Sequence, residues 1–139
     1  MMNQDFGKRF SGKPVLITGH TGFKGGWLAL WLHELGATVH GYALSPPTRP
    51  SLFDVAGIGS VLASDTRGDV RDAERFKAAL DDTQPETIFH LAAQSLVRTS
   101  YSSPMETMSC NVMGTATVLE AARTSGSVRA LVVITSDKV

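Results

Sequence analysis

A glycine-rich turn between a short apolar strand and an apolar helix constrains the fold of this chain more than any other feature. The predicted strand, Val15–Thr18, is apolar and β-branched, and glycines follow at positions 19, 22 and 25. A helix is predicted over residues 22–35, closed by Gly36. Its apolar face is expected to comprise Trp27, Leu28, Leu30, Trp31 and Leu35. This order of elements is typical of the first unit of a parallel α/β sheet.

Strand and helix patterns alternate along the rest of the chain. Further strands are predicted at residues 38–44, 61–63, 87–91 and 130–135. The last is expected to be central and covered on both faces, because it is the most apolar. One helix, over 72–80 with Asp72 as its cap, is expected to bury Ala73, Phe76, Ala79 and Leu80. Another, over 105–123 and stopped by Gly126, is expected to bury Met108, Val112, Thr115, Leu119 and Ala122. The alternation predicts a doubly wound α/β fold with a parallel sheet, the Rossmann architecture.

The spacing of the glycines, Gly-x-x-Gly-x-x-Gly, is explained physically by a bound dinucleotide. Gly19 allows a sharp turn after the strand, Gly22 allows the backbone to approach the phosphates, and Gly25 allows close packing of helix on strand. The pyrophosphate would lie on the unpaired N–H groups at the positive end of the helix. The alternative is a tight glycine turn that binds nothing.

A carboxylate about 20 residues further on holds the adenosine ribose in many NAD-binding folds. Residues 39–43 contain no acidic side chain. The departure either weakens NAD binding or leaves room for a 2′-phosphate, with His40 or Arg49 as its partner. For Arg49 there is a simpler alternative to binding the 2′-phosphate: it is a solvated charge in a loop.

Three other segments are candidate parts of the site. Asp69 could accept a hydrogen bond from an adenine amino group while Val70 packs on the ring. The small residues of Leu91-Ala92-Ala93 would let backbone pass close to a cofactor, although they also suit ordinary packing. Asn111 is either a hydrogen-bond partner of that strand end or a satisfied buried amide.

The last strand is followed by Ser136, Asp137 and Lys138, a hydroxyl, an acid and an amine in succession. The carboxyl ends of central strands in doubly wound folds face the ligand crevice, and such groups suit proton transfer. The alternative is a solvated tip of the chain.

Composition narrows the function classes. Thirteen basic residues balance thirteen acidic ones, so no net charge draws the chain to nucleic acid or to an anionic membrane. We find neither an apolar run long enough to span a bilayer nor a signal peptide. Cys110 is the only cysteine, which fits a reducing, cytoplasmic compartment. No metal site is predicted.

The motifs together resemble the extended short-chain dehydrogenase/reductase superfamily and, within it, the sugar-nucleotide 4,6-dehydratases. The segment Thr18–Leu28, with Lys24 and Trp27, looks like that of the CDP-glucose 4,6-dehydratase family. The other matching segments are residues 68–72, 90–97 and 135–138. The resemblance assigns NAD binding to Gly19, His20, Thr21, Gly22, Phe23, Lys24, Gly25, Asp69, Val70, Leu91, Ala92 and Ala93.

The resemblance implies an internal redox dehydration of CDP-glucose, with NAD as cofactor, that yields CDP-4-keto-6-deoxyglucose for the deoxysugars of surface polysaccharide. Ser136 would hydrogen-bond the C4 oxygen, and Asp137 would protonate the departing C6 hydroxyl. Lys138 stands where the related dTDP-glucose enzymes have a glutamate base, so it would have to be deprotonated to accept the C5 proton. A homodimer or larger assembly is expected of the complete enzyme.

The family's Tyr-x-x-x-Lys pair and its sugar-nucleotide domain should follow Val139. Neither Tyr42 nor Tyr101 has a lysine four residues later. We therefore expect residues 1–139 to be the cofactor-binding part of a longer enzyme, inactive in isolation. The alternatives are another sugar-nucleotide epimerase, dehydratase or reductase, and a non-catalytic NAD(P)-binding module.

Overall fold

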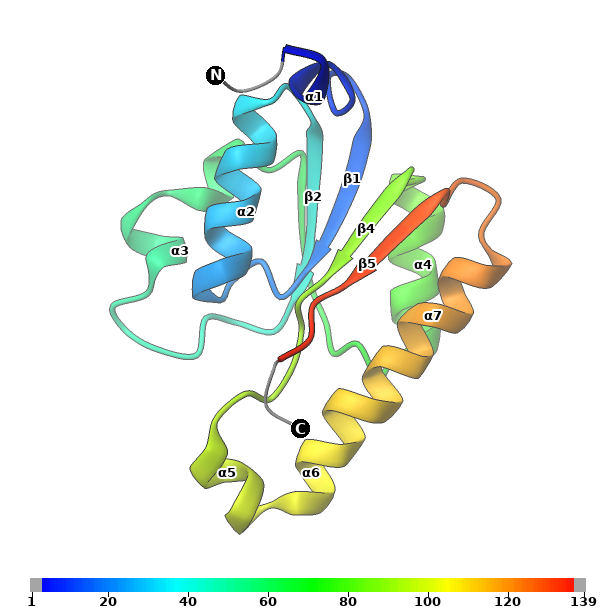
Figure 1. Cartoon of the computed structure of the whole chain (residues 1–139). Helices are drawn as coiled ribbons and strands as arrows, with labels where there is room; N and C mark the ends of the chain where they lie inside the picture. The colour runs from blue at the N-terminus through cyan, green and yellow to red at the C-terminus, as the bar shows by residue number, and fades with distance from the viewer. Residues whose placement is uncertain (1–3, 137–139) are drawn as a thin grey trace.

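Five parallel strands run through the centre of the structure, a computed structural model that describes residues 4–136 (Figure 1). Their spatial order is β3-β2-β1-β4-β5, so the chain starts in the middle, builds one edge and then crosses over to build the other. The strands are β1 (Pro14–Thr18), β2 (Thr38–Ala43), β3 (Ser64–Arg67), β4 (Thr87–His90) and β5 (Ala130–Val133). The switch from one edge to the other occurs beside β1, where such sheets bind ligands.

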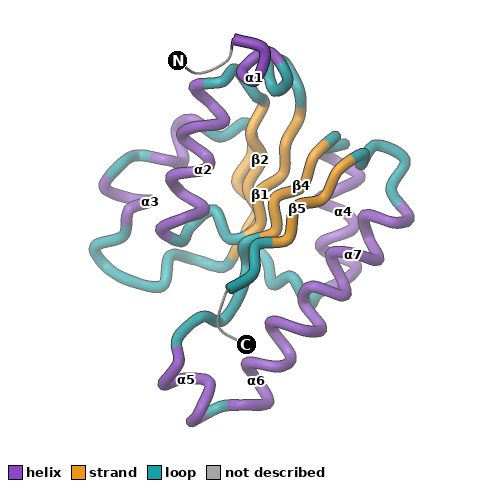
Figure 2. The backbone as a smooth tube through the Cα atoms, viewed as in Figure 1, coloured by secondary structure: helices purple, strands orange, loops and turns teal. Residues whose placement is uncertain are grey.

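Helices cover both faces of the sheet (Figure 2). Helices α2 (Phe23–Glu34) and α3 (Leu52–Val55) pack on one face, and α4 (Ala73–Thr83) and α7 (Gly114–Thr124) on the other. Strand β1 is buried on both faces. Val15 and Ile17 belong to the hydrophobic cluster under α2 and α3, and Leu16 belongs to the cluster under α4 and α7. Residues on alternate sides of a strand explain the unbroken apolar run.

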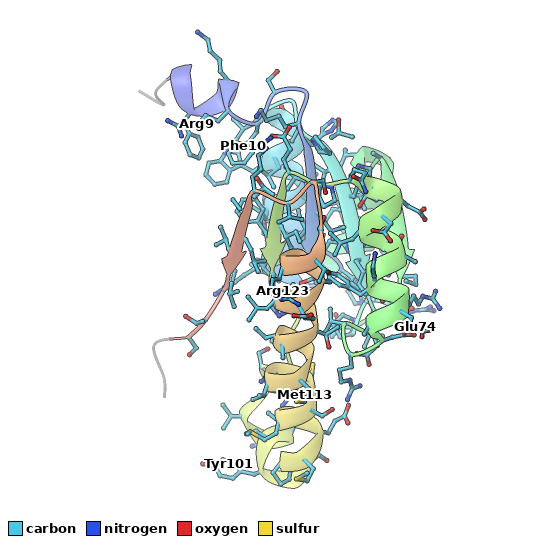
Figure 3. All side chains as sticks on the ribbon, turned by 90° about the vertical axis from the view of Figure 1, so that its right-hand side faces the viewer. Arg9, Phe10, Glu74, Tyr101, Met113 and Arg123 are labelled. Carbon is cyan, nitrogen blue, oxygen red and sulfur yellow. The ribbon has the colours of Figure 1, made fainter. Side chains whose placement is uncertain are left out.

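A helical arm projects beyond the sheet, as the positions of Tyr101 and Met113 show in Figure 3. It comprises α5 (Val97–Ser102), α6 (Pro104–Met108) and a π-helical turn, Ser109–Met113, that leads into α7. A short helix at the other end, α1 (Gln4–Lys8), completes the structure. Within residues 4–136, no helix is both long and apolar enough to cross a membrane.

The predicted fold class is confirmed, together with most of the elements around the glycine turn. Strands β1, β2 and β4 begin and end within one residue of their predicted limits. Gly36 follows α2 with φ +82°, the left-handed conformation expected of a helix-ending glycine. Asp72 caps α4 by accepting a hydrogen bond from the backbone N–H of Arg75 at 3.1 Å.

Two strand predictions were wrong. The third strand lies at Ser64–Arg67, and the apolar residues expected to form it belong partly to a short 3₁₀ helix, Ile58–Val61. Strand β3 is polar because it is an edge strand with one neighbour. Strand β5, expected to be central, is the opposite edge of the sheet in this structure, and Val132 is 42% exposed.

The predicted helix faces also need correction. Helix α2 buries Gly25, Gly26, Ala29 and Leu32, whereas Trp27 and Trp31 are exposed. Small residues face the sheet because the helix lies close to it. Helix α7 buries Gly114, Val118 and Ala121, each one position before a residue predicted from the 3.6-residue pattern. Met108, Val112 and Leu119 are exposed, and the first two of these lie on the arm, beyond the end of the sheet (Figure 3). Ala73 is exposed as well, at the start of α4.

Candidate functional site

The turn after β1 leaves the amino terminus of α2 open to an anion. Gly22 is the N-cap residue, and within residues 4–136 this helix has no side-chain cap hydrogen bond. Its first turn contains no acidic residue that would occupy the positive end of the helix dipole. The twelve-residue helix therefore presents unpaired backbone donors at the carboxyl edge of the sheet, the arrangement that binds a pyrophosphate.

The glycines of the turn have different physical roles. Gly19 has φ +79°, and a Cβ there would lie 2.9 Å from the backbone nitrogen of Ala92, so the turn sits directly against the residues after β4. A Cβ on Gly25 would overlap the carbonyl oxygen of Gly19. On Gly22 the nearest atom would be 3.4 Å away, an ordinary contact. Protein packing thus requires Gly19 and Gly25 but leaves space beside Gly22, which fits a cradle for a group outside the chain.

A buried hydrogen-bond chain joins the ends of β1 and β4 beneath this turn. The Thr18 Oγ1 accepts from the backbone nitrogens of Leu91 at 3.1 Å and Ala92 at 3.2 Å. Because both lone pairs are then used, the hydroxyl donates its hydrogen to His90 Nδ1, 2.7 Å away. His90 is therefore protonated on Nε2 and donates to Thr115 Oγ1 at 2.9 Å. Burial lowers the pKa of His90, which favours this neutral form.

Two of the predicted cofactor residues in the turn direct their side chains away from it. The His20 ring is completely buried, and its Nε2 lies 2.8 Å from Asp65 Oδ1. Burial lowers the pKa of His20 in spite of this carboxylate. The Thr21 hydroxyl donates to the carbonyl oxygen of Leu44 at 2.9 Å. Both residues therefore offer only their backbone to a ligand at the turn.

Phe23 and Lys24 open the first turn of α2, and both are exposed. With Trp27, Leu28 and Trp31 they line a shallow apolar hollow on the outer side of the helix. Their backbone N–H groups belong to the open helix terminus.

Asp69 and Val70 lie in the loop after β3, as predicted. The Asp69 carboxylate is bound by Arg71, whose NH2 and Nε lie 2.6 and 3.0 Å from it, and this guanidinium lowers the pKa of Asp69. Arg71 also pairs with Glu106 of α6 at 2.8 Å, which ties the loop to the arm. Val70 is buried against Gly114, where a Cβ would lie 2.8 Å from its Cγ2. Its side chain thus packs under α7, beside the expected adenine position.

The residues after β4 are anchored by the arm. The Gln94 N–H donates to Asn111 Oδ1 at 2.7 Å, and Asn111 Nδ2 donates back to the Gln94 carbonyl at 3.0 Å. Of the two alternatives for Asn111, the structure shows the hydrogen-bond partner, on the segment that follows β4. Leu91 and Ala92 are partly buried and Ala93 is exposed, so this extended segment borders the glycine turn from the other side.

Ser136 is exposed and follows β5, whose carboxyl end lies at the same edge of the sheet as the glycine turn because the strands are parallel. Asp137 and Lys138, the other two predicted catalytic residues, lie outside the described residues. Among residues 4–136 no group of three or more His, Cys, Asp or Glu side chains is placed to hold a metal ion.

Neither basic residue suggested for a 2′-phosphate is well placed. His40 bonds Ser64 Oγ at 2.8 Å and lines a hollow with Arg75 and Thr83 on the α4 side of the sheet. Arg49 is exposed in the loop after β2. The basic residue at the carboxyl end of the sheet is Arg67, whose NH1 donates to the Leu44 carbonyl at 3.2 Å. Sequence reasoning missed it because the third strand was expected to end at residue 63. The signal was the alternating polar run Ser64–Arg67.

Comparison with known proteins gives a consistent result. A family model described as GDP-mannose 4,6 dehydratase matches residues 16–139. CDP-glucose 4,6-dehydratase of Salmonella typhimurium is 50% identical over 99% of this chain, which covers 37% of that relative. GDP-mannose 4,6-dehydratase of Yersinia enterocolitica is 35% identical over 82% of this chain and is covered to 32%. The chain thus spans about a third of the length of these curated relatives.

Solved structures of the same architecture contain NAD. A UDP-glucose-4-epimerase from Stenotrophomonas maltophila, with bound NAD and formylated UDP-arabinopyranose, has a TM-score of 0.78 and 25% identity. The match covers 91% of this chain and 38% of that structure. A Thermus thermophilus UDP-glucose 4-epimerase in complex with NAD has a TM-score of 0.69 and 28% identity, covering 84% and 35% of the two chains.

Proposed function

The chain belongs to the GDP-mannose 4,6 dehydratase family, and from this we propose that it is the NAD-binding part of a CDP-glucose 4,6-dehydratase. The observation that supports this best is the 50% identity to a CDP-glucose enzyme along almost the whole chain. The GDP-mannose enzymes among its relatives reach 32–35% over shorter stretches. The substrate is therefore CDP-glucose, and the product is CDP-4-keto-6-deoxyglucose.

The geometry of the turn supports the choice of cofactor. NAD, when bound, supplies reversible two-electron oxidation of a sugar alcohol. The open amino terminus of α2 would hold its pyrophosphate, with Gly22 leaving space for it. The segment 91–93 would border it on the other side, held in place by the Thr18–His90–Thr115 chain. In this chain the residues bind and orient the cofactor through backbone groups more than through side chains.

Catalysis is assigned to the residues after β5. Ser136 would hydrogen-bond the C4 oxygen of the sugar, and Asp137 would protonate the leaving C6 hydroxyl. Lys138 would accept the C5 proton only as a neutral amine, because an ammonium group has no free electron pair. These roles rest on the resemblance and on the position of Ser136 at the carboxyl edge of the sheet. The rest of the enzyme would supply the tyrosine base and the sugar-nucleotide domain.

The complete enzyme is proposed to be a cytoplasmic homodimer or larger assembly that makes deoxysugar precursors for surface polysaccharide. The helical arm supports self-association, because large apolar side chains are exposed along it and would be covered by a second copy. These side chains are Val97, Tyr101, Met105, Met108, Val112 and Met113.

The test is product analysis with matched substrates. The complete enzyme, carrying residues 1–139 at its amino terminus, should convert CDP-glucose to a 4-keto product that absorbs in alkali and should leave GDP-mannose and UDP-glucose unchanged. Residues 1–139 alone should give no product, because the loss of a positioned base costs about 10²–10⁴-fold and substrate positioning several powers of ten more. Epimerised UDP-glucose would instead assign the chain to an epimerase. Turnover by residues 1–139 alone would refute the proposed division of roles.

A further inference from the structure

Arg67 lies beside the end of β2, where the adenosine ribose is expected and where β2 itself provides no carboxylate. Ala43 and Arg67 are register partners at the carboxyl ends of β2 and β3. The guanidinium NH1 donates to the carbonyl of Leu44, the first residue after β2, at 3.2 Å. Dinucleotide-binding folds place the ribose beside this strand end, about 20 residues after the glycine turn. The Thr21 hydroxyl of that turn donates to the same carbonyl, so the turn and Arg67 meet at Leu44.

The guanidinium is held in one orientation. Its Nη2 lies 2.8 Å from Asp65 Oδ2, and its Cζ lies over the Phe53 ring, 4.9 Å from the ring centroid. The other oxygen of Asp65 accepts from the buried His20 ring at 2.8 Å. Arg67 is thus fixed by a carboxylate, an aromatic ring and a backbone carbonyl, while its side chain stays 35% exposed. Such a preorganised fork loses little entropy on binding a ligand.

Arg67 retains donors that a ligand can use. A guanidinium has five N–H groups. The bond to the Leu44 carbonyl occupies one N–H of Nη1, and the bond to Asp65 occupies one N–H of Nη2. A carboxylate at this position would accept from ribose hydroxyls and repel a phosphate. A guanidinium donates to hydroxyl oxygens and attracts a phosphate, so it favours the 2′-phosphate that a carboxylate would repel.

We propose that Arg67 sets the dinucleotide specificity of this chain by donating hydrogen bonds to the adenosine ribose. Through these donors the site binds a ribose with a 2′-phosphate as readily as one with a 2′-hydroxyl. Asp65 limits the effect, because its negative charge offsets that of Arg67 and prevents a strong preference for the phosphorylated form. The inference rests on the proposed function and deepens it. The chain should bind NADH and NADPH with dissociation constants within about tenfold of each other.

The experiment is a fluorescence titration of residues 1–139 with NADH and with NADPH, for the wild-type chain and four variants. Arg67→Ala should raise the Kd for NADPH about tenfold or more and that for NADH less than about threefold, since charged hydrogen bonds to phosphate are the stronger ones. Arg67→Lys should give an intermediate loss. Asp65→Asn, which frees the guanidinium from its counter-charge, should lower the Kd for NADPH. Arg75→Ala removes an equal charge from α4 and should change neither constant.

The possible outcomes distinguish a failure of the Arg67 assignment from a failure of the proposed function. If the wild-type chain binds neither dinucleotide, the proposed function fails and this inference with it. If NADH binds but Arg67→Ala and Arg67→Lys leave the NADPH constant unchanged, only the assignment of Arg67 is wrong. Equal losses for both dinucleotides would mean that Arg67 is structural. Asp65→Asn keeps the test decisive if Arg67→Ala does not fold, because tighter NADPH binding supports the proposal and unchanged binding overturns it.

Discussion

Substitution of Gly25 by alanine adds one methyl group at the tightest point of the candidate site. The new Cβ would overlap the Gly19 carbonyl oxygen and lie 2.8 Å from the Gly19 carbonyl carbon and 2.9 Å from His20 Cα. All three atoms are backbone, so no side chain can turn aside. Helix α2 must move away from the turn, or the turn must open.

The cost can be estimated from this geometry. Overpacking by a methyl group costs about 1–3 kcal/mol, while alanine in place of glycine inside a helix returns about 1 kcal/mol. Because the contact is with backbone, we expect the upper part of the range, a net loss of about 1–2 kcal/mol in the free energy of unfolding. That loss corresponds to a fall in Tm of about 2–8 °C for a domain of this size.

Chemical denaturation and NADH titration together test this reasoning. Gly25→Ala should lose stability and, because the helix terminus moves relative to the phosphates, should bind NADH at least about tenfold more weakly. Gly126→Ala is the matched control, since its Cβ would meet nothing within 4 Å and stability should change by less than about 0.5 kcal/mol. A Gly25→Ala protein as stable as the wild type, with unchanged NADH affinity, would refute the argument.

Three further predictions follow from the site. Burial lowers the pKa of His20, His40 and His90 below the ordinary value of 6.5. As the pH falls through 6.5, the unfolded chain binds more protons than the folded chain, so the free energy of unfolding should fall. Melting curves from pH 8 to about pH 5.5 should show a falling Tm, and a constant Tm would contradict this. Thr18→Val leaves the partly buried N–H of Ala92 without its acceptor and should cost about 1–3 kcal/mol in urea unfolding. Thr18→Ser keeps the hydroxyl and should cost under half as much, and equal losses would exclude the hydroxyl as the cause. In the complete enzyme, Asp137→Asn should slow dehydration of CDP-glucose more than oxidation at C4, so NADH absorbance should accumulate during turnover; unchanged product formation would remove Asp137 from the mechanism.

The centre of the fold could be predicted because its sequence signals are local. The apolar run at Val15–Thr18, the glycines after it and the Asp72 cap each follow from the backbone conformation of one short segment. Strand β3 could not be found in this way, since an edge strand needs few apolar residues and Ser64–Arg67 has none. The buried face of α7 was misplaced by one residue because the predicted pattern starts from apolar residues of the arm, Met108 and Val112, that are exposed and do not pack on the sheet.

The site was predictable in position but less so in the role of each side chain. The glycine spacing located the turn, yet it contains no information on where His20 points, and this depends on Asp65 from a distant strand. The hydrogen bond between Asn111 and Gln94 was anticipated because a polar residue in an apolar helix segment needs a partner. Arg67 became visible only when β3 was placed correctly, since its importance comes from lying at a strand end.

Fluorescence titration with NADH of the wild-type chain and of Gly22→Val shows whether the glycine turn binds a dinucleotide. Gly22 has φ −81°, which any residue adopts, and a Cβ there makes only an ordinary contact at 3.4 Å. The variant should therefore keep its fold, seen as an unchanged circular dichroism spectrum. The wild-type chain should bind NADH saturably, and the folded variant should not bind it, because the branched side chain would fill the phosphate position. Equal affinities of the two proteins for NADH would contradict it.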